Sequence, residues 1–164
     1  MQTHLHFSYE WHLAATPAAV WQVLTRLEAW PLWWSAVTDV EQVSAGNGRG
    51  EGAVLLSLWK GWLSPPVAVE MRTLVAEENI LLVTKSSGAM QGLGRWELTE
   101  IPVGVTVRYT GRVSLTPFLQ WFYPVLKPFM YAHYQHTMRT GAEGLARQLG
   151  VELIDCQEVA YETS

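Results

Sequence analysis

Tyrosine hydroxyls are the groups in this sequence best placed to act on a bound molecule. Tyr109 belongs to the inward set of an alternating strand pattern, and Tyr134 belongs to the apolar stripe of a long helical pattern. A hydroxyl in apolar surroundings can orient a carbonyl group and polarise it. Arg95 would face the interior with these tyrosines only if the register of its strand shifted by one residue. In the favoured register Trp96 is buried and Arg95 is on the outer face. No nucleophile stands at a recognisable spacing from a base, so these three residues are weak catalytic candidates and enzymatic activity is left open.

Five histidines raise the question of a metal site. His133 and His136 are three residues apart on the predicted helix, close enough to share one metal ion. We expect them on the flank of the helix rather than on its inner stripe, with a structural or surface role, because a metal site requires three or four ligands. A second group shares the outer face of the first predicted strand: His4, His6, Glu10 and His12. Nothing fixes a closed coordination shell there, so the sequence predicts no metal site and no cofactor.

The glycine-rich segment 46–50 is a further candidate for binding chemistry. A phosphate-binding loop follows a strand and opens a helix, whereas a strand pattern follows this segment. We therefore interpret it as a turn. Cys156 is the single cysteine of the chain and lies near its C-terminal end, so the sequence excludes an internal disulfide and gives no support to a catalytic thiol.

Composition and charge narrow the class of protein. The chain has 164 residues, of which 49% are hydrophobic and 16% charged, and it contains nine tryptophans, which are typical of large cores and apolar pockets. The net charge of −4 is concentrated in residues 151–164, since the rest of the chain has 11 acidic and 11 basic residues. A neutral body without a basic stripe argues against nucleic-acid binding. We expect residues 151–164 to form a solvated, partly disordered acidic tail, with a short added strand as the alternative.

Targeting signals are not recognisable in the sequence. No apolar run approaches the ~20 residues that span a membrane, and the first residues lack the basic and apolar regions of a signal peptide. We therefore expect a cytoplasmic protein without a transmembrane segment.

A long helical pattern from Pro117 to Gly150 organises the remaining elements. Thr116 is a suitable N-cap, and Pro124 and Pro128 predict a bend in the first half. The inner stripe recurs every three or four residues: Leu119, Tyr123, Leu126, Met130, Tyr134, Met138, Gly141, Leu145 and Leu149. A second apolar stripe covers only the first half: Phe118, Phe122, Val125 and Phe129. This helix requires a partner surface, and its first half presents two apolar faces.

Strand patterns supply that surface. Residues 4–13 and 105–115 alternate most cleanly, and less regular patterns cover 37–43, 51–59, 67–75, 80–85 and 95–100. Two short helices follow the first strand, within residues 16–27 and 28–35. The order predicts an α+β fold, in which a seven-stranded curved antiparallel sheet wraps around the long C-terminal helix. We predict one domain over residues 1–150, followed by the acidic tail.

Three stretches match the pattern of a known superfamily. They are residues 14–24 with the Trp30-Pro31-Leu32-Trp33-Trp34 run, the glycine-rich turn at 46–52, and residues 136–145 of the closing helix. Together they resemble the START-like (SRPBCC) superfamily, which has the helix-grip or birch-pollen-allergen fold, and in particular its polyketide cyclase/dehydrase-like branch. The resemblance covers residues 4 to about 150. It implies a cavity between the sheet and the long helix that opens near the N-terminal half of the helix.

The resemblance also suggests which residues bind a ligand. A lipid, a polyketide or another flat hydrophobic molecule suits an apolar cavity with a few polar groups. Loops at 60–66 and 87–92 are expected at its mouth. The candidate ligand-binding residues are Trp59, Trp62, Met90, Trp96, Tyr109, Tyr123, Met130, Tyr134 and Met138.

Three hypotheses follow. In the first, the chain binds or carries a hydrophobic small molecule without changing it. In the second, it is an enzyme of the cyclase/aromatase kind that acts on a poly-ketone, with Tyr109, Tyr134 and Arg95 as handles. In the third, it is an interaction module that forms a homodimer through the second apolar stripe.

Overall fold

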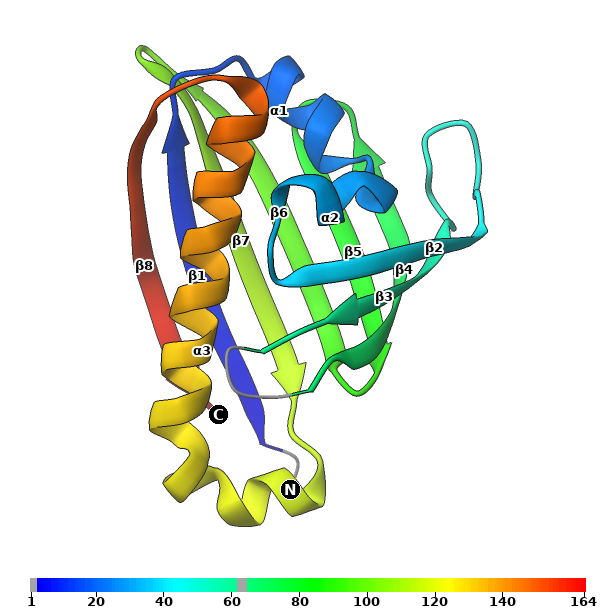
Figure 1. Ribbon diagram of the computed structural model, residues 1–164, viewed down its shortest axis with the longest axis vertical. Coiled ribbons are helices and arrows are strands. Elements are labelled where there is room, and N and C mark those ends of the chain that lie inside the picture. Colours follow the sequence, from blue (N-terminus) through cyan, green and yellow to red (C-terminus); the bar gives the residue numbers. More distant parts are fainter. Residues whose placement is uncertain (1–2, 62–64) are drawn as a thin grey trace.

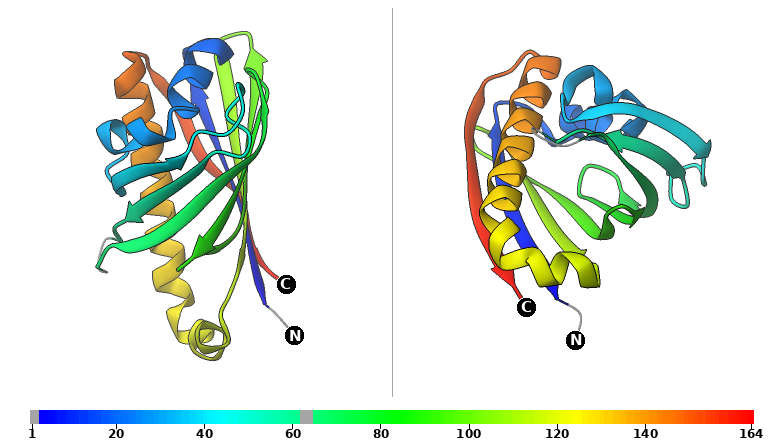
Figure 2. Two further views of the ribbon diagram at one scale, coloured as in Figure 1. Left: turned by 90° about the vertical axis from the view of Figure 1, so that its right-hand side faces the viewer. Right: turned by 60° about the horizontal axis from the view of Figure 1, so that its bottom comes forward.

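The computed structural model describes residues 3–61 and 65–164, and within them a curved antiparallel sheet holds a long helix (Figure 1). The strands lie in the order β2-β3-β4-β5-β6-β7-β1-β8. Figure 2 shows the strong curvature of the sheet, with the helix inside the curve. The strands are β1 His4–Leu13, β2 Val37–Ser44, β3 Val54–Trp59, β4 Val67–Glu77, β5 Leu81–Gly88, β6 Gln91–Ile101, β7 Gly104–Ser114 and β8 Leu153–Thr163. The predicted α+β class is confirmed.

The C-terminal segment corrects two expectations. We expected seven strands and a solvated tail after residue 150, but β8 pairs antiparallel with β1 and makes eight strands among the described residues. The backbone NH of His4 donates to the carbonyl oxygen of Ser164 at 2.8 Å, and the NH of Ser164 donates back at 3.0 Å. Without β8, β1 would be an edge strand with a row of unpaired backbone groups. The acidic residues that suggested a tail belong to an edge strand, on which Asp155 and Glu162 remain exposed.

Alternation predicts the buried face of most strands correctly. Every second residue of β1, from Leu5 to Leu13, is buried, and Val105 and Val107 are buried on β7. The strand β4 departs from the pattern because its register against β5 shifts between Thr73 and Val75. This shift buries Ala76 in place of the next residue in strict alternation. Residues 86–94, predicted as a link, mostly extend β5 and β6.

The short helices follow β1 and carry tryptophans into the core. They are α1 (Pro17–Leu24), the 3-10 turn η1 (Leu27–Ala29) and α2 (Trp30–Trp33). Thr16 caps α1, because its side-chain oxygen accepts a hydrogen bond from the NH of Ala19 at 3.2 Å. Both α1 and α2 contact the second half of the long helix, above the sheet in Figure 1.

The long helix α3 (Pro117–Leu149) is capped by Thr116 and ends at Gly150, whose φ of 67° suits glycine. Its first turns lie across the lower end of the molecule before the helix rises along the sheet (Figure 1), so the predicted bend is present where Pro124 and Pro128 interrupt the hydrogen bonding. Two glycines allow the second half to approach α2 closely. A Cβ on Gly144 would lie 1.8 Å from the carbonyl oxygen of Trp33, and one on Gly141 would lie 2.7 Å from the ring of Trp34.

No helix in the described part of the chain is long and apolar enough to cross a membrane.

Candidate ligand cavity

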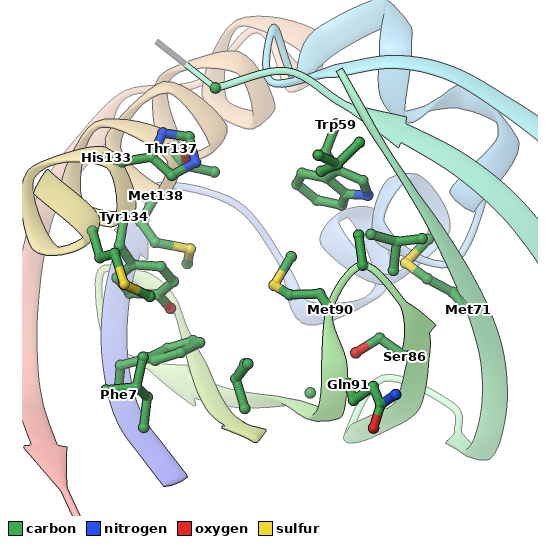
Figure 3. A pocket seen from close by; sticks show the side chains of 18 of the residues that line it. Phe7, Trp59, Met71, Ser86, Met90, Gln91, His133, Tyr134, Thr137 and Met138 are labelled. Carbon is green, nitrogen blue, oxygen red and sulfur yellow. The ribbon is translucent and has the colours of Figure 1, made fainter. Parts of the chain in front are cut away.

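A cavity of about 260 Å³ lies between the concave face of the sheet and the first half of α3 (Figure 3). Its walls come from β1, β3 to β8, α2 and α3, so it is assembled from both ends of the sequence. The volume lies just under the range of about 300–1,000 Å³ that is common for small-molecule sites. The cavity is therefore large enough for a small organic molecule of one to two rings.

Tryptophans form the deep end of the cavity. Trp30, Trp34 and Trp96 are buried there, and Trp59 lies beside them. The ring of Trp34 lies 5.2 Å from that of Trp59 and 6.0 Å from that of Trp96, measured between ring centroids. These rings present apolar surface to the cavity, since packing among them occupies much of their edges.

The indole NH groups of two tryptophans that line the deep end have partners within the protein. Trp30 donates to the carbonyl oxygen of Leu24, and Trp34 donates to that of Thr137, both at 2.9 Å. Because these donors are satisfied within the protein, the deep end offers few polar groups to a ligand.

A cluster of aromatic rings lines one wall. The ring of Phe7 lies 3.9 Å from that of Tyr134 and 6.0 Å from that of Tyr109, and Tyr109 lies 4.4 Å from Trp96. Burial raises the pKa of Tyr109 to about 12 and raises the pKa of Tyr134 well above its usual value. Both tyrosines are therefore protonated at neutral pH and can donate a hydrogen bond.

Two hydroxyl groups of the cavity wall, those of Tyr134 and Tyr161, are buried and have no hydrogen-bond partner among the described residues. Tyr134 lies on α3 within the aromatic wall formed with Phe7 and Tyr109. The pKa of Tyr134 is raised chiefly by desolvation, with smaller contributions from the neighbouring Tyr109 and Tyr9. A buried hydroxyl without a partner costs about 1–3 kcal/mol relative to a satisfied one. An acceptor atom on a bound molecule would remove that cost.

The mouth of the cavity is more polar and more exposed. Lys60 at the end of β3, Gln91 at the start of β6, and Thr116 and His133 on α3 line the cavity and are exposed to solvent. The tip of the β5–β6 hairpin adds Met90 to this rim (Figure 3). Partial burial, with a smaller effect of the nearby His136, lowers the pKa of His133 below its usual value. The only charged or readily charged groups on the described cavity wall are thus at the entrance.

Most of the predicted ligand-binding residues lie in the cavity wall. Seven of the predicted residues are lining residues in the described part of the chain: Trp59, Met90, Trp96, Tyr109, Met130, Tyr134 and Met138. Trp62 lies outside the described residues. The remaining predictions, for Tyr123, Arg95 and His133, differ from the structure.

Tyr123 is not a lining residue. It packs against Leu5 and Leu115 at the lower end of the sheet, and its hydroxyl lies 2.9 Å from the side-chain oxygen of Thr163. Thr163 belongs to β8, which was expected to be a tail, so the sequence did not indicate this partner.

Arg95 points away from the cavity. Its guanidinium group donates a hydrogen bond to the carboxylate of Glu97 at 2.9 Å, on the exposed face of β6. Trp96 and Leu98 are buried on the other face, as the favoured register predicted. The structure thus removes Arg95 from the candidates for contact with a ligand.

His133 lies in the cavity wall, whereas we expected it on the flank of the helix. It follows Met130 by three residues and precedes Thr137 by four, and both of those residues also line the cavity. This spacing was the signal that could have placed it.

Other lining residues were also missed by the sequence analysis. Phe7, Trp30 and Trp34 line the cavity, and none of them was among the predicted ligand-binding residues. Inward orientation alone does not distinguish a residue that lines a space from one that fills the core. Among the described residues, no group of three or more His, Cys, Asp or Glu side chains is arranged to hold a metal ion.

A protein-family model described as "Polyketide cyclase / dehydrase and lipid transport" matches residues 4–150. Its span ends before β8. A search of curated proteins gave no match.

Solved structures share the fold at low sequence identity. The aromatase/cyclase ZhuI from Streptomyces sp. R1128 has 11% identity and a TM-score of 0.66, with 92% of this chain and 94% of that chain covered. A START superfamily protein from Mycobacterium smegmatis has 15% identity and a TM-score of 0.69, with 90% and 97% covered. The di-domain ARO/CYC protein StfQ of the steffimycin biosynthetic pathway has 11% identity and a TM-score of 0.69, with 90% of this chain but only 52% of StfQ covered. This chain therefore spans about half the length of StfQ, and these similarities concern the fold.

Proposed function

This chain belongs to the polyketide cyclase/dehydrase and lipid transport family, and from that premise we propose that it binds a small, flat, uncharged hydrophobic molecule that carries an oxygen acceptor. The observation that carries the proposal is the unpartnered hydroxyl of Tyr134 in a largely apolar cavity of about 260 Å³, whose wall also holds the unpartnered hydroxyl of Tyr161. A carbonyl or ether oxygen of the ligand accepts a hydrogen bond from the hydroxyl of Tyr134. The aromatic walls supply van der Waals contact and bury the apolar part of the ligand.

The charge distribution in the cavity supports an uncharged ligand. A charged group at the deep end would lose its hydration among Trp34, Trp96 and Met138 without a counter-ion, which is strongly unfavourable. Lys60 and His133 at the mouth can tolerate a polar or anionic end of the ligand. The deep end therefore selects the hydrophobic part of the molecule.

Two probes of the same shape test this proposal. α-Tetralone is a bicyclic ketone, and tetralin is the hydrocarbon of the same ring skeleton without the carbonyl group. Four methionines line the cavity, namely Met71, Met90, Met130 and Met138, so protein with 13C-labelled methionine methyl groups reports binding by NMR. We expect α-tetralone to shift these signals and to bind five- to tenfold more tightly than tetralin, because one hydrogen bond contributes about 1 kcal/mol.

The Tyr134→Phe variant isolates the hydroxyl. It should bind tetralin as the wild type does and lose the preference for the ketone. Tyr131→Phe is the matched control, because Tyr131 lies on the same helix and its hydroxyl donates to Glu158 outside the cavity. If neither probe moves the methyl signals, the binding proposal is wrong. If Tyr134→Phe keeps the preference, the role of the hydroxyl is wrong.

Catalysis of a cyclisation is the second candidate function. It is favoured by the presence of two protonated tyrosines, Tyr109 and Tyr134, on the same wall of the cavity. Two such donors can hold a folded poly-ketone and polarise one carbonyl group. Their raised pKa values make them donors rather than bases near neutral pH. Turnover of a reactive poly-ketone that survives both Tyr109→Phe and Tyr134→Phe would remove these residues from the reaction.

A further inference from the structure

A cluster of exposed hydrophobic side chains covers the outer surface of the first turns of α3. We call it the aromatic patch, and it consists of Phe118, Trp121, Phe122, Val125 and Phe129. Trp121 is 82% exposed, Val125 74% and Phe118 70%. The rings of Phe118 and Phe122 pack on each other with centroids 4.9 Å apart, which leaves their outer surfaces in solvent. Single exposed hydrophobic residues are ordinary, whereas a contiguous patch of this kind marks an interaction surface.

The spacing of the patch makes this segment apolar on two sides. Its residues follow one another at intervals of three or four, or within one turn, and so share one side of the helix. Leu119 and Met130, on the same segment, line the cavity. The segment that separates the cavity from solvent is therefore hydrophobic both toward the cavity and toward the outside.

The stretch of sequence that contains the patch has a net charge opposite to that of the whole chain. From Ile101 to Ala142 the sequence contains no Asp or Glu, while it contains Arg108, Arg112, Lys127 and Arg139. This stretch therefore carries +4, whereas the full chain carries −4, so the rest carries −8. Arg108 is paired with Glu10, and Glu162 is exposed on β8 beside Thr163. The positive charge that belongs to the patch segment itself is therefore that of Lys127. Lys127 is the only Asp, Glu, Lys or Arg residue in the sequence from 113 to 138, so this segment attracts a negatively charged surface.

We propose that the aromatic patch docks the protein on the surface of an anionic lipid bilayer. Trp and Phe side chains partition into the interface between headgroups and acyl chains, and basic residues nearby add attraction to anionic lipids. The patch lies at the lower end of the molecule in Figure 1, on the helical segment that borders the cavity mouth. Docking in this position brings the mouth next to the bilayer.

A second copy of the chain is the alternative occupant, and the size of the patch argues against it. With ~150–250 Å² for each large aromatic side chain, the exposed parts of the patch amount to about 600 Å². A specific protein interface buries about 800 Å² on each partner and usually adds polar pairs around its centre. A fluid lipid surface does not require this complementarity.

Vesicle co-sedimentation tests the proposal without reference to the cavity ligand. We expect the wild-type chain to bind vesicles of phosphatidylglycerol and phosphatidylcholine, and to bind vesicles of phosphatidylcholine alone at least tenfold more weakly. The double variant Trp121→Ser and Phe129→Ser should lose binding by at least tenfold. The matched control is Leu32→Ser, because Leu32 is 78% exposed on α2, away from the patch, and its replacement should leave binding unchanged.

The outcomes separate docking from the alternatives. Failure of the wild type to bind either vesicle overturns the proposal, as does equal binding by the double variant. Equal affinity for both vesicle types overturns the claim that the patch prefers an anionic bilayer. A dimer in sedimentation velocity that the double variant abolishes assigns the patch to a second copy. The methyl signals of the cavity methionines respond to α-tetralone in the double variant if the proposed function holds, so the two proposals can fail independently.

Discussion

The two halves of α3 share one helix but have different surroundings. From Met138 to Ala146 most residues are buried: Met138, Gly141, Ala142, Gly144, Leu145 and Ala146. In the described helix before Met138, Tyr123 is the only buried residue, and the rest of that half faces the cavity, the solvent or both. The second half packs against α1 and α2, whereas the first half borders a space. The second half of α3 therefore stabilises the fold, whereas the first half is available to contact a ligand.

The largest effect is expected for Gly144→Ala in the second half. A Cβ at this position would lie 1.8 Å from the backbone oxygen of Trp33, so α3 or α2 must move. We expect the free energy of unfolding to fall by more than about 3 kcal/mol, measured by urea denaturation.

Gly141→Ala is the graded control for this prediction. There the added methyl group meets the ring of Trp34 at 2.7 Å, and a side chain can shift more easily than a backbone oxygen. We expect a smaller loss of stability. If Gly144→Ala is as stable as the wild type, close packing does not define the second half.

A pair of truncations compares the two halves directly. Leu145 is 0% exposed and lies outside the cavity wall, and Leu145→Ala should lower the free energy of unfolding by about 2–4 kcal/mol, because it removes buried methylene groups and leaves a void. Phe129 is 62% exposed, and Phe129→Ala should change it by less than about 0.5 kcal/mol. Differential scanning calorimetry on both variants checks this. Equal losses would mean that the two halves do not differ in their contribution to the fold.

Alkaline pH probes the aromatic wall beneath the first half. The pKa of Tyr109 is raised to about 12 in the folded protein, from a usual value of 10.0. The folded state therefore holds this proton more tightly, and the stabilisation is complete below pH 10 and is lost as the pH rises from about 10 to about 12. Within that window Tyr109 contributes a slope of about 1.4 kcal/mol per pH unit. Unfolding curves at several pH values should show it, and Tyr109→Phe should have a smaller slope. An identical slope in that variant would contradict the burial of this hydroxyl.

A small effect on stability is also expected for Tyr134→Phe. Its hydroxyl has no partner among the described residues, so removing it should leave the free energy of unfolding within about 1 kcal/mol, or raise it slightly. The same change should reduce the preference for α-tetralone over tetralin. A loss of ligand preference without a loss of stability is expected for a residue that binds the ligand and not for one that stabilises the fold. A loss of more than about 2 kcal/mol in thermal unfolding would show that this hydroxyl is a structural group.

The sequence predicts the fold better than it predicts the cavity. Alternation in β1 and β7 identifies their buried faces because a strand with one solvated face has a period of two. It fails for β8, because an edge strand rich in acidic residues has the composition of a tail. It also fails at Thr73 in β4, since a register shift depends on the partner strand.

The cavity is harder to predict because it forms where inward-facing side chains from different elements do not contact one another. Trp96 and Tyr134 line the cavity and were among the predicted ligand-binding residues, whereas Phe7, Trp30 and Trp34 also line it and were not. Tyr123 and Met130 share one stripe in the sequence and one hydrophobic cluster in the structure, but only Met130 lines the cavity, and the hydroxyl of Tyr123 lies against Thr163 of β8. Tertiary contacts of this kind arise only when the whole chain is packed.

Hydrogen exchange along α3, measured with and without saturating α-tetralone, tests the central claim most directly. We predict that amides of residues 119–134 exchange faster than those of residues 141–149 in the free protein, and that the ketone slows exchange in the first group only. Uniform exchange along the helix, or protection by the ketone that is confined to residues 141–149, would contradict the division of α3 into a half that holds the fold and a half that covers a ligand cavity.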